Sequence, residues 1–218
     1  MNADLGAVNS ADHRYETIRR SVDAEIEISR SRFLTRLARV TTEDEARDVI
    51  AEVKAEHPRA RHHCTAYVIG PDSRVQRSND DGEPSGTAGA PMLDALVSAG
   101  LSDVVAVVTR YFGGVLLGAG GLTRAYRGAV AGAVAQAQRQ VREELVPVSV
   151  VLGYDLAAPL EAEARRRKYV VGDAEYAEEV TQTYWVRPSE SDALVELIQE
   201  ITAGGAKVEL GLTEFVDL

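Results

Sequence analysis

The sequence is poor in the residues that disulfides, metal centres and membrane spans require. Cys64 is the single cysteine among 218 residues, so no internal disulfide can form and we expect a cytoplasmic protein. The four histidines show no zinc-site spacing, and the sequence implies no metal and no cofactor. No apolar run reaches membrane-spanning length, and residues 1–16 lack the apolar core of a signal peptide.

The sequence also lacks a surplus of positive charge. Its formal net charge is −10, with 17 Lys and Arg against 18 Asp and Glu in residues 1–140, and 7 against 16 in residues 141–218. This balance opposes non-specific binding of a polyanion, so any RNA contact must be local. The basic run from Arg165 to Lys168 suits the C-terminal end of a helix, and a contact with RNA or an acidic protein is the alternative.

Glycine is concentrated in two turns, over residues 82–89 and 113–121, on either side of an apolar strand at residues 104–108. Glycine permits positive φ and close approach of a ligand, and a helix that follows the turn supplies free N–H groups. The pattern therefore predicts an anion-receptive surface. Neither turn matches a P-loop or a dinucleotide fingerprint, so hydrolysis of a nucleoside triphosphate is not indicated.

We predict a binding surface from the polar and glycine residues of this region. Its members are Asp80, Asp81, Glu83, Gly86, Thr87, Arg110, Tyr111, Gly113, Gly114, Gly118, Gly120, Gly121, Arg124 and Arg127. The three arginines could clamp a phosphate, because a guanidinium binds phosphate through two hydrogen bonds. Alternatively, the glycines permit tight packing and the arginines pair with the acidic members. The acidic members themselves fit a capping turn better than a magnesium site.

The chemistry of a nucleophile is weakly represented. Cys64 and His62 share a strand face but lie roughly 6–7 Å apart, which favours a buried thiol over a catalytic pair. We predict no catalytic residue. The alternative is an enzyme that acts on a nucleotide or another phosphorylated small molecule, with Glu83 or Asp81 as the general base.

Hydrophobic periodicity predicts a tail at residues 1–14 and two domains, at residues 15–140 and 145–218. In the first domain, Thr42 and Thr87 are expected to cap helices, and another helix is expected from Leu122. In the second, the order is β-α-β-β-α-β, with a helix from Pro159 and a last strand that includes Leu212. The expected class is α+β.

Four motifs in this region resemble those of the IMPACT/YigZ family. Residues 78–84 read SNDDGEP, residues 86–89 read GTAG, residues 107–114 read VVTRYFGG and residues 122–126 read LTRAY. The resemblance covers nearly the whole chain and is strongest over residues 62–127. It implies an N-terminal α/β sandwich similar to the second domain of ribosomal protein S-five, then a ferredoxin-like domain similar to one in elongation factor G.

The resemblance also implies a link to translation. We expect a translation-associated regulatory or binding protein, a monomer without membrane contact, that docks RNA, the ribosome or a regulatory protein partner through residues 80–127. Eukaryotic relatives regulate translation by competing for a protein partner. This chain shows no recognisable extra domain for such a partner.

Overall fold

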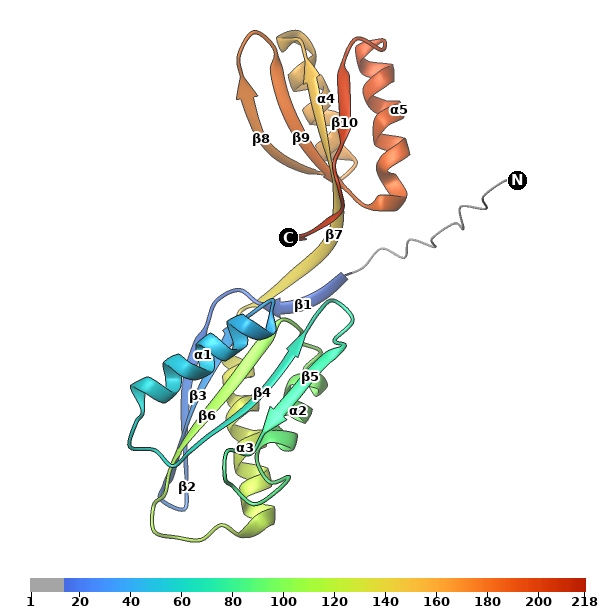
Figure 1. The fold of residues 1–218 in the computed structure, drawn as a ribbon. Coiled ribbons are helices and arrows are strands. Elements are labelled where there is room, and N and C mark those ends of the chain that lie inside the picture. The colour runs from blue at the N-terminus through green and yellow to red at the C-terminus, as the bar shows by residue number, and fades with distance from the viewer. Residues whose placement is uncertain (1–13) are drawn as a thin grey trace, which may run out of the picture. The chain divides into compact units, whose positions relative to one another are not determined.

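The structure is a computed structural model that describes residues 14–218. The chain folds into two compact units, an N-terminal unit of Tyr15–Arg142 and a C-terminal unit of Glu143–Leu218 with Arg14 (Figure 1). The predicted tail lies outside the described residues, apart from Arg14. This residue begins β1 (Arg14–Ile18), a strand that the sequence did not predict and that pairs with β7 (Arg139–Leu152).

An antiparallel five-stranded sheet organises the N-terminal unit, in the order β2-β3-β6-β4-β5. The strands are β2 (Val22–Ile28), β3 (Ser31–Arg39), β4 (His62–Ile69), β5 (Val75–Asn79) and β6 (Val104–Tyr111). β6 lies in the middle and is buried from Val104 to Arg110, which confirms the prediction of a central strand. A strand that is apolar on both faces requires cover on both faces.

Helices supply this cover. α2 (Gly89–Ser98) and α3 (Gly118–Gln136) pack on one face of the sheet, and α1 (Glu43–Glu56) packs on the other (Figure 1). Tyr126 of α3 is fully buried and meets Phe33 of β3 edge to face, with ring centroids 5.2 Å apart. Burial of one such side chain stabilises a fold by about 1.5–3 kcal/mol, so this layer holds α3 firmly on the sheet.

The C-terminal unit is ferredoxin-like, as the sequence predicted. It consists of β7, α4 (Tyr154–Arg166), β8 (Val170–Tyr176), β9 (Val180–Val186), a 3₁₀ turn (Pro188–Glu190), α5 (Ser191–Thr202), β10 (Lys207–Leu210) and β11 (Glu214–Asp217). Its central strand order is β10-β7-β9-β8. The two mixed units confirm the predicted α+β class.

Several helix and strand ends differ from the predictions. Thr42 caps α1 as expected, because its hydroxyl accepts a hydrogen bond from the Glu45 N–H. The predicted cap Thr87 is wrong, since its hydroxyl donates to the Pro84 carbonyl instead. α3 and α4 both begin earlier than predicted, at Gly118 and at Tyr154. The last predicted strand also differs, because β10 ends at Leu210 and Leu212 lies outside it, 91% exposed. A further strand, β11, was not predicted.

Candidate functional site

The first glycine turn is organised by its own carboxylate. Asp80 accepts hydrogen bonds from the N–H groups of Gly86 at 2.7 Å, Ala88 at 3.0 Å and Gly89 at 2.8 Å. Burial raises the pKa of Asp80, but these three bonds outweigh it and hold the pKa below its ordinary value. An internal carboxylate therefore uses the donors that the sequence assigned to an external anion, and it caps α2 in place of Thr87.

Glu83 lies beneath the surface and forms an ion pair with Arg110. One carboxylate oxygen accepts from Arg110 Nη1 at 2.8 Å and from the Tyr126 hydroxyl at 2.7 Å. The two charged side chains are only 4% and 8% exposed. A buried charge needs such a partner because its desolvation is costly. The sequence left two possibilities for this pair, and the structure places it in the buried arrangement.

Asp81 is held by β4 and α1. Its carboxylate accepts from the His63 N–H at 2.7 Å and pairs with Lys54 at 3.2 Å. Burial raises the pKa of Asp81, and the His63 N–H and Lys54 bring it below the ordinary value. Asp81 and Glu83 are both held in ion pairs, so neither is the free general base that the enzyme alternative requires.

The second glycine turn fixes an exposed loop. A Cβ on Gly113 would lie 1.9 Å from the Arg30 carbonyl oxygen, so only glycine fits against the β2–β3 hairpin. Gly114 and Gly118 have φ of +85° and +65°, which other residues adopt only with strain. α3 then begins without a side-chain cap, and Gly120 and Gly121 lie in its first turn. The loop carries Phe112 at 58% and Leu116 at 87% exposure.

The other predicted arginines lie apart from the buried pair. Arg127 forms an exposed ion pair with Asp94 of α2. Arg124 is exposed in α3, and within residues 14–218 no ion-pair partner is found for it. Of the predicted set, Arg110 and Tyr111 line an open cleft.

This cleft is cationic and has a volume of about 510 Å³. Its lining residues are Arg59, Ala60, Arg61, His62, Arg110, Tyr111, Phe112 and Leu116. None of these described residues is acidic, and the exposed guanidinium groups of Arg59 and Arg61 have no ion-pair partner within residues 14–218. We call it the cationic cleft. Its two outer arginines were not predicted from the sequence, although the spacing of Arg59, Arg61 and His62, just before and at the start of β4, was a usable signal.

Arg110 forms part of the cleft between two aromatic rings. Its guanidinium carbon lies 5.5 Å from the Phe33 ring centroid and 5.7 Å from that of Phe112. Its Nε is buried and has no hydrogen-bond partner. A buried donor left unpaired costs roughly 1–3 kcal/mol. The cleft therefore combines positive charge and an exposed aromatic ring, which together suit an anion that carries an aromatic group.

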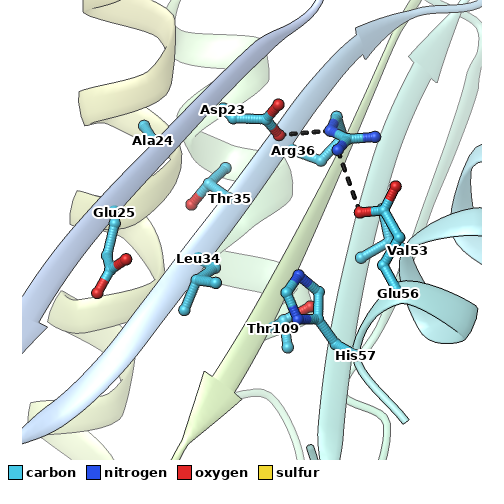
Figure 2. A pocket seen from close by; sticks show the side chains of 10 residues that line it. All are labelled: Asp23, Ala24, Glu25, Leu34, Thr35, Arg36, Val53, Glu56, His57 and Thr109. Atoms are coloured by element: carbon cyan, nitrogen blue, oxygen red, sulfur yellow. Dashed lines mark hydrogen bonds and ion pairs between the residues drawn. The ribbon is translucent and has the colours of Figure 1, made fainter.

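A second hollow of about 260 Å³ lies next to the cationic cleft and is lined mainly by β2, β3 and the end of α1. Figure 2 shows Arg36 between Asp23 and Glu56. The Arg36 guanidinium donates to both carboxylates, and its Nη2 lies 3.2 Å from Glu56 Oε2. We call this hollow the acidic groove. The two hollows adjoin, because His57 of the groove and Tyr111 of the cleft have Nδ1 and hydroxyl oxygen 3.1 Å apart.

Cys64 is fully buried, which confirms that it is packed. Its thiol donates to the Asp80 carbonyl at 3.0 Å, and burial raises its pKa to about 12. A thiol with such a pKa supplies almost no thiolate at neutral pH. Within residues 14–218, no group of three or more His, Cys, Asp or Glu could hold a metal ion.

The basic run in the C-terminal unit is paired internally. Arg165 bonds to Glu161, and Arg166 and Arg167 both bond to Glu163, all on the exposed face of α4. These pairs are the short-range contacts expected on a helix surface. None of the helices described is both long and apolar enough to cross a membrane.

Comparison with known proteins gives consistent matches over both units. The Impact N-terminal domain family matches residues 29–134, and a domain of unknown function, DUF1949, matches residues 150–204. IMPACT family member YvyE of Bacillus subtilis is 39% identical over 94% of this chain and 94% of its own length. IMPACT family member YigZ of Escherichia coli is 46% identical over 62% of this chain and 68% of its own.

Two further matches extend over most of the chain. An IMPACT family member from Thermus thermophilus, in the pol 5′ region, is 37% identical over 84% of this chain and 99% of its own length. A crystal structure of a hypothetical protein is 33% identical, covers 90% of this chain and 96% of its own, and superposes with a TM-score of 0.63.

Proposed function

The chain belongs to the IMPACT family, and from this premise we propose that it is a translation-associated binding protein that docks RNA in its cationic cleft. Family membership supports a translation-related regulatory role at the level of the family. RNA as the ligand and the cleft as its site are the specific parts of the proposal.

The open charge of the cleft is the observation that carries the proposal. Arg59 and Arg61 have no carboxylate partner within residues 14–218, whereas many surface arginines of this chain are paired. Unpaired guanidinium groups attract phosphate and release counterions when they bind it. The exposed Phe112 ring next to them favours a single strand, in which bases are free to stack.

The proposal is compatible with the net charge of −10, because most of the negative charge lies beyond residue 140. A local contact of this kind should be weak and sensitive to salt. With about two phosphates neutralised by Arg59 and Arg61, the slope of log affinity against log salt should be about −1.4 for a single strand.

The test is fluorescence anisotropy of a labelled oligouridine with the full chain, measured over a salt series. Arg59→Ala with Arg61→Ala should lower the affinity about tenfold and make the slope shallower by about 1.4. Arg165→Ala with Arg166→Ala removes the same charge from the C-terminal unit and should change neither. Equal effects of the two double variants, or an affinity that does not depend on salt, would refute RNA docking in the cleft.

A further inference from the structure

We infer that the cationic cleft holds one unstacked nucleotide, with its base on the Phe112 ring and its phosphate between Arg59 and Arg61. This inference deepens the proposed function and rests on it. It names the ligand unit as a nucleoside monophosphate group rather than phosphate alone.

One face of the Phe112 ring is covered by Arg110, and the other face is open to a ligand. Its ring lies over the Arg110 guanidinium at 5.7 Å, and the side chain is nevertheless 58% exposed. Tyr111, the other aromatic residue of the cleft, is held through its hydroxyl by His57 and contacts that ring edge to face. Phe112 is therefore the aromatic surface that remains available for stacking.

The backbone next to Phe112 is fixed in place. The Gly113 N–H donates to the Ser31 hydroxyl at 3.2 Å, and Gly113 lies too close to Arg30 for any side chain. A ring that is attached to a fixed backbone loses little freedom when a base stacks on it. This contact requires glycine at position 113, and it positions Phe112 at the cleft.

The positive charge lies where a phosphate attached to the stacked base can reach it. Arg59 and Arg61 supply exposed guanidinium groups, while Arg110 is only 8% exposed and its charge is paired with Glu83. The cleft volume of about 510 Å³ lies in the range of small-ligand sites. A phosphate joined through a sugar to an aromatic base matches this combination.

The experiment titrates the full chain with three probes and follows amide chemical shifts by NMR. The probes are uridine 5′-monophosphate, ribose 5-phosphate, which lacks the base, and uridine, which lacks the phosphate. Base stacking on an aromatic side chain should make uridine 5′-monophosphate bind about tenfold tighter than ribose 5-phosphate. Uridine should bind more weakly than uridine 5′-monophosphate.

Variants separate the contribution of the base to binding from that of the phosphate. Phe112→Ala should remove the tenfold advantage of uridine 5′-monophosphate and leave ribose 5-phosphate unchanged, and Phe112→Trp should preserve the advantage. Tyr176→Ala, which removes a 68% exposed aromatic side chain from the C-terminal unit, is the matched control and should have no effect. Because Phe112 is exposed, its replacement should leave the fold intact.

The possible results distinguish this inference from the proposed function. Equal binding of uridine 5′-monophosphate and ribose 5-phosphate, or no effect of Phe112→Ala, overturns the nucleotide site even if RNA binding depends on Arg59 and Arg61. Base-dependent binding of the mononucleotide without any RNA binding supports the site and overturns the proposed function.

Discussion

The cationic cleft and the acidic groove adjoin across one His57–Tyr111 contact, yet their charged side chains differ in whether they are paired within the protein. In the groove, Arg36 bonds to Asp23 and Glu56, and Glu25 forms a two-point pair with Arg32. The charges of the groove are thus largely satisfied within the protein. In the cleft, Arg59 and Arg61 have no such partners within residues 14–218.

This difference teaches that the sign of the charge in a hollow indicates ligand binding less well than whether the charged side chains are already paired. An exposed ion pair contributes about 0–1 kcal/mol, and a ligand must break it before it can use either charge. An unpaired guanidinium group can bind a phosphate without that cost. The pairing therefore favours the cleft as the ligand site, although both hollows are open to solvent.

The largest effect should come from the buried pair below the cleft. Glu83→Ala removes the partner of the Arg110 charge and one acceptor of the Tyr126 hydroxyl. We expect a loss of about 3–5 kcal/mol in the free energy of unfolding, because an uncompensated charge is left in the core. Glu56→Ala, in the groove, should cost less than about 1 kcal/mol.

Urea denaturation followed by circular dichroism measures both variants. Glu83→Gln keeps hydrogen-bonding capacity and should recover part of the loss. If Glu83→Ala and Glu56→Ala proved equally mild, the contrast between a buried pair below the cleft and an exposed pair in the groove would fail.

The sequence predicted the framework around the cleft better than the cleft itself. The apolar residues 104–108 identified β6 as a central strand, and Thr42 was recognised as the cap of α1, since both signals are local. Arg59 and Arg61 were missed because they lie about fifty residues before Phe112. The antiparallel pairing of β4 with β6, which places His62 opposite Arg110, brings them together.

Tertiary contacts also decide what each glycine turn does. The donors of the first turn bind Asp80, six to nine residues earlier in the chain, and the sequence alone could not show that they were already in use. Gly113 of the second turn is required by the Arg30 carbonyl of a distant hairpin. In both turns glycine was correctly associated with backbone geometry, while the group that approaches the backbone was protein rather than an anion.

A smaller effect is expected from the caps of α2 and α1. Asp80→Ala leaves three N–H groups, one in the turn and two at the start of α2, without their acceptor, and it should cost about 2 kcal/mol. Thr42→Ala, at the start of α1, removes one acceptor and should cost about 1 kcal/mol. Thermal unfolding measured at neutral pH compares the two variants.

Acid should remove the difference between these two caps. The folded pKa of Asp80 lies below the ordinary value of 3.8, so the stability that it contributes is present above this pH and is lost as pH falls through the folded pKa. The cost of Asp80→Ala should shrink over that window, whereas the cost of Thr42→Ala, which involves no titrating group, should stay constant. A cost of Asp80→Ala that did not change in acid would contradict this role of the carboxylate.

The smallest effect is expected when the charge of the groove itself is altered. Glu25→Gln with Glu56→Gln removes two negative charges next to the cleft but adds no phosphate contact. At about 0.15 M salt, charges more than roughly 8 Å apart are largely screened, so RNA affinity should rise less than twofold. The salt slope should stay near its parent value, because the slope counts phosphates that are contacted and not the general field. The anisotropy series used for Arg59 and Arg61 measures both quantities. A clearly steeper slope would mean that Arg32, released from Glu25, or Arg36, released from Glu56, had become a phosphate ligand, and the groove would then belong to the same binding surface as the cleft.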